Sequence, residues 1–284
     1  MVRLAAIVLL AGCGATLAAQ IDARVRAQPD AELVSVAYVE LGDGATFLRD
    51  ADARVHAAST MKLPVMMEVY RRVAAGELTL DFSVKVENRF HSIVDGSEYQ
   101  LDPGDDADPE PYAREGQEAP VGWLVERMIV RSSNLATNLV IQLVGADAVT
   151  GMCRGLGATA IDVLRGVEDG KAHEAGRDNT ATARDLMVLL RALGERRVAG
   201  ADAMIDVLAR QQLNEGIPAG LPAATRVAHK TGMIDRIYHD AALVLPERGG
   251  AYVLVVLTRG IADGGQAQRL VADLSRIVWD RRAR

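Results

Sequence analysis

Ser59 and Lys62 stand three positions apart and carry complementary chemistry. Apolar residues then recur at helical spacing: Leu63, Met66, Met67 and Tyr70. This stripe predicts a helix with one buried face, and residues three apart share a face, so the serine and the lysine can meet at its start. A lysine that is desolvated or near another cation loses its proton readily and can activate a serine hydroxyl. Alone, the pair also fits an ordinary helix start with a serine cap and a solvated lysine.

Two further polar motifs follow at element boundaries. Ser132-Ser133-Asn134 lies between two predicted helices and, alone, fits helix capping. Lys230-Thr231-Gly232 lies within a predicted strand, residues 226–233, where alternate side chains point to opposite faces. Each motif is common by itself. Their order along the chain, Ser-x-x-Lys, Ser-x-Asn and Lys-Thr-Gly, is the informative signal.

With these motifs in this order, the sequence resembles the penicillin-recognising serine hydrolases, most closely the class A β-lactamases. The resemblance extends from about Arg24 to Trp279. It includes Asn138 after the second motif and Ile217-Pro218 and Leu221-Pro222 before the third.

The resemblance implies a catalytic role for four side chains. Ser59 attacks the carbonyl carbon of the substrate, and Lys62 manages the serine proton. Ser132 relays a proton to the leaving nitrogen, assisted by the positive charge of Lys230. Two lysines in one cleft are also expected to lower each other's pKa, which favours a basic Lys62.

The same resemblance implies the substrate contacts. Asn134 meets the side-chain amide of the substrate, and Lys230-Thr231-Gly232 receives its carboxylate. The backbone N–H groups of Ser59 and Met233 form the oxyanion hole, where losing one donor costs roughly 3 to 4 kcal/mol in comparable enzymes.

The chain departs from the class A pattern at two places. Ser133 stands where class A enzymes usually have aspartate, and serine is common there in penicillin-binding peptidases. In the loop that should carry the deacylating glutamate, Arg165 is followed by Gly166, Val167 and Glu168, but Asp169 replaces the expected proline and Ala172 the expected asparagine.

Glu168 is the first candidate for the base that activates water in that loop, and Glu174 is the second. A solvated loop carboxylate is the competing interpretation of Glu168. An ion pair between Arg165 and Asp178, across the neck of the loop, would hold Glu168 over the cleft.

The predicted strands come from both ends of the chain: 33–41, 45–48, 226–233, 241–245 and 251–258. Helices fill the middle, and a last helix carries Leu270, Val271 and Leu274 on one face. The fold class is therefore α/β (α+β), with a five-stranded antiparallel sheet flanked by helices. We expect an α/β subdomain from residues 20–75 and 216–284 and an all-helical subdomain from 76–215, with 102–120 as a solvated acidic loop.

The N-terminus, residues 1–19, has the pattern of an export signal. Arg3 precedes the apolar run from Leu4 to Leu10, and the whole apolar stretch is too short to span a membrane. Leu10-Ala11-Gly12-Cys13 resembles a bacterial lipobox, which would lipidate Cys13 and anchor the exported protein. Cleavage after Ala18-Ala19, giving a soluble periplasmic protein, is the alternative. Cys153 then remains single, and its helical spacing predicts a small buried hydrophobe.

Composition excludes several other classes of protein. A net charge of −6 and 4% aromatic residues argue against a nucleic-acid partner. The five histidines lack metal-ligand spacing, so we expect no metal and no cofactor. The sequence predicts a monomeric, exported serine hydrolase that opens the ring of a β-lactam through an acyl-serine. A D,D-peptidase or esterase acting on peptidoglycan-like substrates, and a β-lactam receptor that is acylated without turnover, are the alternatives.

Overall fold

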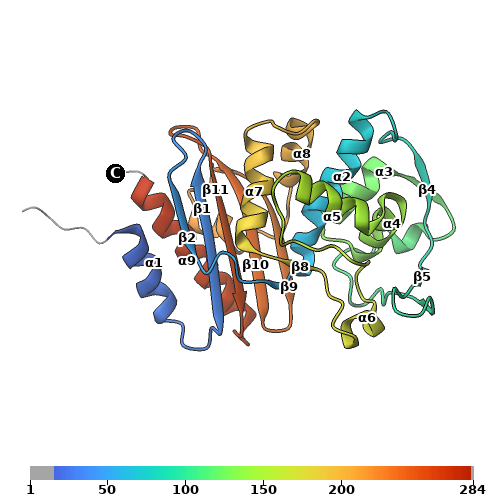
Figure 1. Cartoon of the computed structure of the whole chain (residues 1–284), viewed down its shortest axis with the longest axis horizontal. Helices are drawn as coiled ribbons and strands as arrows, with labels where there is room; N and C mark the ends of the chain where they lie inside the picture. The colour runs from blue at the N-terminus through green and yellow to red at the C-terminus, as the bar shows by residue number, and fades with distance from the viewer. Residues whose placement is uncertain (1–15, 283–284) are drawn as a thin grey trace, which may run out of the picture.

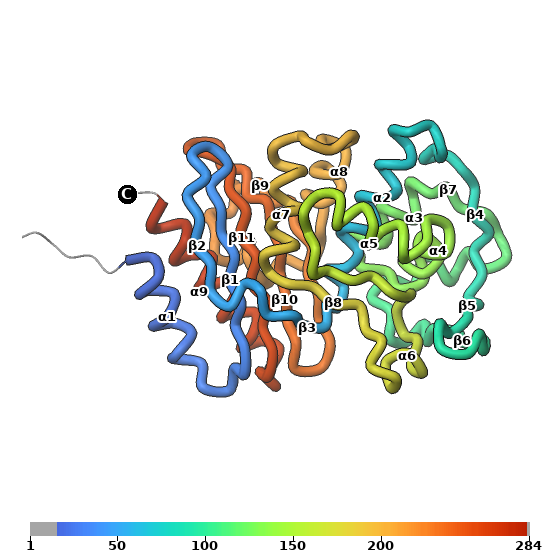
Figure 2. Tube along the Cα trace, in the orientation of Figure 1, coloured from blue at the N-terminus to red at the C-terminus, as the bar shows by residue number. Residues whose placement is uncertain are grey.

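A five-stranded antiparallel sheet forms one half of the molecule, and a group of helices forms the other (Figure 1). The computed structural model describes residues 16–282, so Cys13 and most of the predicted signal segment lie outside the described residues. The strand order is β2–β1–β11–β10–β9. Their bounds are β1 Leu33–Glu40, β2 Thr46–Arg49, β9 Arg226–Ile234, β10 Ile237–Leu245 and β11 Tyr252–Arg259. The predicted sheet from both ends of the chain is confirmed, and it places β9 at the edge nearest the helices (Figure 2).

The sheet is covered on both faces, which explains its nearly continuous apolar strands. Along β11, Leu254 and Val256 pack in one apolar cluster, while Val253 and Val255 pack in the other. Helices α1 (Leu17–Arg26) and α9 (Gly264–Arg282) cover the first face, and α7 (Ala183–Gly194) covers the second (Figure 1). β10 begins at Ile237 rather than at the predicted residue 241. The apolar pattern does not indicate these first residues as strand, because the buried residues His239 and Asp240 are polar.

The helical half is built around α2, whose predicted apolar stripe is buried. The helices and 3-10 turns of this half and of its connections are η1 Ala58–Met61, α2 Lys62–Ala74, η2 Tyr112–Arg114, α3 Val121–Val130, α4 Asn134–Val144, α5 Ala146–Gly155, α6 Gly170–Glu174, α8 Ala201–Leu208 and η3 Ile217–Gly220. Cys153 is fully buried, as its spacing predicts. Among residues 16–282, no single helix is long and apolar enough to cross a membrane, although the bent pair α4 and α5 together meets the length and composition test.

The segment 76–215 is not all helical, contrary to the expectation. It contains the strand pairs β4 (Ser83–Lys85) with β7 (Glu118–Pro120) and β5 (Phe90–His91) with β6 (Glu98–Tyr99). Its strand β8 (Thr180–Ala181) pairs with β3 (Val55–His56). These strands have two or three residues each, too few for a periodic signal in the sequence. The same segment supplies α7, which packs on the sheet.

The acidic loop 102–120 is also more structured than a solvated loop. The carboxylate of Asp108 is fully buried and pairs with Arg127 of α3. The side chain of Asp106 bonds the start of α4. Acidic residues in this loop therefore fix the helices beside them, which composition alone does not reveal.

Gly220 marks a close contact between η3 and α9. Ser275 Oγ donates to the carbonyl of Ile217 across this contact at 2.9 Å, and a methyl group at Gly220 would stand 2.1 Å from the Ala272 carbonyl oxygen. Only a residue without Cβ fits there unless a backbone moves.

Gly220→Ala should therefore lower the free energy of unfolding by about 2 kcal/mol or more, the cost of overpacking a rigid contact. The matched control is Gly151→Ala in α5, where a methyl group meets no atom within 4 Å. That change should raise the free energy of unfolding by about 0.8 to 1 kcal/mol, since alanine is the better helix former. Urea unfolding followed by circular dichroism measures both; equal effects would contradict the described packing of α9.

Candidate active site

Ser59 lies in the 3-10 turn η1, directly before α2 begins at Lys62. It is therefore not in the first turn of the α-helix, as the apolar spacing suggests, but in a tighter turn leading into it. Ala58 has a φ of 45°, in the left-handed region that side-chain-bearing residues rarely adopt. The N–H of Ala58 donates to His56 Nδ1 at 3.0 Å. The turn thus holds Ser59 in a defined backbone conformation.

Lys62 is fully buried beside the second motif. Its Nζ donates to the Ser132 carbonyl at 2.6 Å, to Asn134 Oδ1 at 2.8 Å and to Ser132 Oγ at 3.2 Å. Burial lowers the pKa of Lys62 from 10.5 to about 7, while the charges of Asp106 and Glu168 oppose this change. At neutral pH the amine is therefore available in both protonation states.

Lys230 approaches the same serine from β9. Its Nζ donates to Ser132 Oγ at 3.1 Å and to the Thr231 carbonyl at 2.9 Å. Burial lowers the pKa of Lys230 below its usual range, and the nearby charge of Lys62 lowers it further. Burial is thus the largest cause for both lysines, and the repulsion expected from the sequence acts on Lys230 but is not among the causes of the Lys62 shift. Ser132 Oγ lies between the two amines, and its residue has a φ of 60°.

Side chains from two segments bond the backbone at the start of α4. Ser133 is the N-cap of α4, its Oγ accepting from the Ala136 N–H at 3.2 Å. A carboxylate reaches the same place from the acidic loop, because Asp106 Oδ2 accepts from the N–H groups of Asn134 at 2.8 Å and Leu135 at 3.0 Å. Sequence reasoning missed Asp106, since nothing in its spacing separates it from the other acidic residues of the loop.

β9 passes directly against the turn that carries Ser59. A methyl group at Gly232 would stand 3.0 Å from the Ser59 amide nitrogen and 3.1 Å from Ala58 Cβ. Glycine at this position therefore allows the strand and the turn to approach. Thr231 is buried, whereas Met233 is 62% exposed and lines a cavity together with Ser59. The two backbone segments expected to supply the oxyanion hole are brought together.

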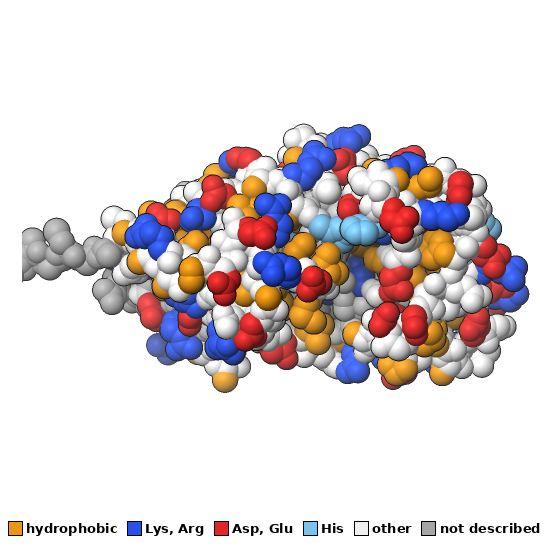
Figure 3. All heavy atoms as spheres, turned by 90° about the horizontal axis from the view of Figure 1, so that it is seen from below, with side chains coloured by type: hydrophobic (Ala, Val, Ile, Leu, Met, Phe, Trp, Pro, Cys, Tyr) orange, Lys and Arg blue, Asp and Glu red, His pale blue; other side chains and the backbone are white. Residues whose placement is uncertain are grey.

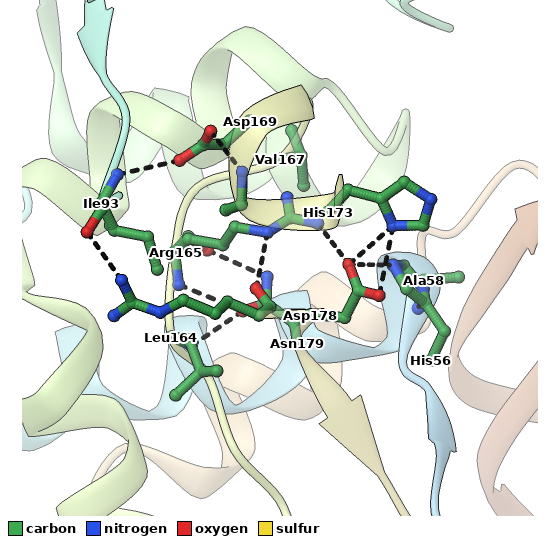
Figure 4. A network of polar contacts seen from close by, with 12 residues as sticks. His56, Ala58, Ile93, Leu164, Arg165, Val167, Asp169, His173, Asp178 and Asn179 are labelled. Atoms are coloured by element: carbon green, nitrogen blue, oxygen red, sulfur yellow. Dashed lines mark hydrogen bonds and ion pairs between the residues drawn. The ribbon is translucent and has the colours of Figure 1, made fainter. Parts of the chain in front are cut away.

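The loop after α5 is tied at its neck. Arg165 Nη2 lies 2.7 Å from Asp178 Oδ1, which confirms the expected ion pair (Figure 4). Asn179 Oδ1 accepts from the Arg165 N–H at 3.1 Å, and Asn138 of α4 bonds both the N–H and the carbonyl of Val167, at 2.6 and 3.1 Å. Side chains from outside the loop thus fix the backbone on both sides of Gly166.

Glu168 follows this fixed stretch and points to the second motif. Its Oε1 accepts from Asn134 Nδ2 at 2.7 Å, and its φ of 63° is left-handed. Although the residue has a large exposed surface, partial burial raises the pKa of its carboxyl, and the bond from Asn134 lowers it.

The other residues of the loop do not take the same position. Asp169 caps α6, its Oδ1 accepting from the Ala172 N–H at 3.0 Å. Ala172, where asparagine is expected, is fully buried. Glu174 ends α6 as an exposed residue and is not among the residues that line the cavity beside Ser59.

The cavity in front of Ser59 has a volume of about 450 Å³. Its walls come from the turn with Ser59 and the strand before it, the acidic loop, the loop with Glu168, the start of α4 and the end of β9. They are formed by His56, Ala58, Ser59, Asp105, Asn134, Arg165, Val167, Glu168, Asp169, Gly170, His173, Asn179, Met233 and Ile234. The space-filling view shows histidine side chains beside a hollow between the two halves of the molecule (Figure 3). Within residues 16–282, no group of three or more His, Cys, Asp or Glu side chains is placed to hold a metal ion.

The sequence pattern of the Beta-lactamase enzyme family matches residues 16–282. The chain belongs to this family. Together with the three motifs, whose side chains Lys62, Ser132 and Lys230 meet at one serine hydroxyl, this makes the protein a serine hydrolase of the β-lactamase type. No curated protein sequence gave a match.

Solved structures with the same fold cover nearly the whole chain. A β-lactamase from Sphaerobacter thermophilus is 28% identical, with a TM-score of 0.80 over 93% of this chain and 97% of that chain. The structure of PBP-A is 25% identical, with a TM-score of 0.80 over 93% and 95%. The last common ancestor of Gram-negative class A β-lactamases is 23% identical, with a TM-score of 0.80 over 94% and 99%, and shows the fold alone.

The lowered pKa of Lys62 gives a direct test of the site. Observed through the ¹³Cε shift of labelled lysine, Lys62 should titrate near pH 7 instead of near 10.5. Asp106→Asn removes a negative charge that favours the ammonium form, so the midpoint should move to lower pH. Asp102→Asn is the control, because Asp102 is not among the charges that shift the pKa of Lys62, and it should leave the midpoint in place. A midpoint near the ordinary value would contradict the buried, hydrogen-bonded position of Lys62.

Proposed function

We propose that this protein hydrolyses the ring amide of β-lactams through an acyl intermediate on Ser59. The observation that carries the proposal is the continuous polar chain from Lys62 Nζ through Ser132 Oγ to Lys230 Nζ, with contacts of 3.2 and 3.1 Å, beside the turn that presents Ser59. A nucleophile, a base of lowered pKa and a relay to a leaving group are the parts that acyl transfer requires.

In the acylation step, neutral Lys62 accepts the proton of Ser59 as Oγ attacks the carbonyl carbon. The negative charge that develops on the carbonyl oxygen meets the N–H groups of Ser59 and Met233. The ring C–N bond then breaks, and Ser132 gives its proton to the nitrogen while it takes one from Lys62. Lys230 and Thr231 receive the carboxylate of the substrate, and Asn134 its amide.

In the deacylation step, Glu168 takes a proton from a water molecule, and the resulting hydroxide attacks the ester carbonyl. The bond from Asn134 and the loop contacts of Asn138, at a cavity that both Glu168 and Ser59 line, support this role. The raised pKa of its carboxyl makes it a stronger base once ionised. The C–O bond to Ser59 then breaks, and the proton held by Glu168 passes to Oγ, which restores both the serine hydroxyl and the carboxylate.

Ser59→Ala should abolish covalent labelling by penicillin G without unfolding the protein. Mass spectrometry of the intact chain and of its peptides measures the adduct, which in the wild type should lie on the peptide that contains Ser59. Ser133→Ala is the control, because this serine caps α4 and should leave labelling at Ser59 intact. An adduct on Ser132, or one that survives Ser59→Ala, would contradict the assignment.

Glu168→Gln should leave acylation nearly unchanged and slow deacylation about 100-fold or more, because the water loses its base. Rapid-quench mass spectrometry with a chromogenic cephalosporin separates the two steps by following the acyl-enzyme with time. Glu174→Gln is the matched control and should behave as wild type. Trapping in Glu174→Gln but not in Glu168→Gln would assign the base to Glu174 instead.

One comparison favours a second function, a D,D-peptidase or a receptor that is acylated without turnover. PBP-A is 25% identical, and a PBP-A variant is described as an acyl-enzyme complex with penicillin G. Ser133 and the altered loop point the same way. If wild type stays acylated for hours and Glu168→Gln changes nothing, the receptor or peptidase function replaces the hydrolase.

A further inference from the structure

His56 connects the turn that carries Ser59 with the neck of the loop that carries Glu168. Its side chain is 24% exposed and lines the cavity. Its Nδ1 accepts the N–H of Ala58 at 3.0 Å, so this nitrogen is unprotonated and the ring proton lies on Nε2. Nε2 in turn lies 3.6 Å from Asp178 Oδ1 (Figure 4). None of the catalytic motifs includes this residue.

The bond to Ala58 holds a backbone that is not at its preferred conformation. Ala58 has a φ of 45°, and such left-handed backbone is strained for a residue with a side chain unless its surroundings stabilise it. Gly232 packs against the same turn, with the space for its missing side chain filled by the Ser59 amide and Ala58 Cβ. The orientation of the Ser59 N–H therefore depends on the turn that His56 supports.

Charged groups surround the imidazole from each neighbouring element. Asp178 accepts from Arg165 at 2.7 Å and lies 3.0 Å from His173 Nδ1, whose ring stands edge-on to His56 (Figure 4). On the sheet side, His239 Nε2 donates to the His56 carbonyl at 3.0 Å. Burial lowers the pKa of His56, Asp178 raises it, and Arg165 and His173 lower it.

We propose that His56 is a positioning residue for Ser59 and makes acylation sensitive to pH through the Ala58 hydrogen bond. The inference rests on the proposed function. When a proton adds to Nδ1, that nitrogen can no longer accept the Ala58 N–H, and the imidazolium is drawn to Asp178 at the neck of the loop. The left-handed turn then loses its support, and the oxyanion donor at Ser59 loses its orientation.

The direction of the pH dependence follows from the protonation state of His56 that accepts the Ala58 N–H. The neutral imidazole holds the turn, so acylation falls as pH drops through the pKa of His56, which lies below 6.5. Protonation of Lys62 also slows acylation at acid pH, but it acts equally in wild type and in a His56 variant. The ratio of the two rates therefore isolates His56.

The variant His56→Asn separates the hydrogen bond that supports the Ala58 turn from the titration of the imidazole. An asparagine carbonyl oxygen can accept the N–H two residues on, as in an Asx-turn, but it does not titrate. Acylation by penicillin G is followed by rapid-quench mass spectrometry from pH 5 to 8.5, with circular dichroism at each pH. The rates of wild type and His56→Asn should agree within about threefold at pH 8.5, and the advantage of the variant should grow towards about tenfold as the pH falls through the pKa of His56.

Two further variants test whether the turn needs the acceptor at position 56 and whether His173 causes the acid loss. His56→Ala removes the acceptor and should lower acylation about tenfold or more at every pH. His173→Asn keeps the Ala58 bond and should retain the acid loss, shifted to somewhat higher pH, because His173 lowers the pKa of His56. A rate ratio between wild type and His56→Asn that stays constant with pH, or an acid loss that disappears in His173→Asn, would overturn the proposal.

A measurement without substrate separates this proposal from the proposed function. In ¹⁵N NMR spectra, the Ala58 amide of wild type should titrate together with His56 Nδ1, and in His56→Asn it should not titrate. If wild type is not acylated at any pH, the proposed function fails, and these spectra still decide whether His56 holds the turn. An Ala58 amide that ignores the titration of His56 overturns the positioning role.

Discussion

Two lysine side chains are buried around one serine hydroxyl, and this arrangement constrains the rest of the site. An amine in a protein interior is costly when charged, so each lysine needs either compensating charge or a lowered pKa. Lys62 has hydrogen bonds to Ser132 and Asn134 and the nearby charges of Asp106 and Glu168. Asp106 and Glu168 therefore balance the charge of Lys62, and Glu168 also lines the cavity.

This balance explains why residues distant in the sequence act together. Asp106 comes from a loop before α3, yet it bonds the backbone of Asn134, which in turn contacts both Lys62 and Glu168. Asn134 thus connects the lysine with the loop carboxylate. A change at any of these positions alters the electrostatic surroundings of the same amine, and its effect on Lys62 depends on the others.

Much of this arrangement could be predicted from the chain, because apolar periodicity reports burial. The sheet from both termini and the stripe of α2 follow from spacing alone, and the motif order groups Ser59, Ser132 and Lys230. The Arg165–Asp178 ion pair was also predictable, since both residues flank one loop. The role of Asp106 was not, because a carboxylate that caps a distant helix has no local pattern.

His56 escaped prediction for the same reason. Its contacts with Ala58 and Asp178 depend on how the loop folds back, not on its neighbours in sequence. The short strands β4 to β8 and the 3-10 form of the Ser59 turn were also missed, since elements of two to four residues are too short to show a period. Apolar spacing in the sequence does not predict the local structure where contacts between distant residues determine the backbone conformation.

Left-handed backbone at Ala58, Ser132 and Glu168 has a consequence for how this protein can change over generations. The three positions lie in the turn that carries Ser59, in the Ser-x-Asn motif and in the loop that carries Glu168, and each holds a side chain where glycine is preferred. Glycine there would relax the backbone but remove a side chain or loosen the segment that aligns it. Selection for heat resistance alone would therefore replace these three residues early, whereas selection for turnover would keep them and their strained backbone. Variants of this chain chosen for heat resistance should be sequenced there first.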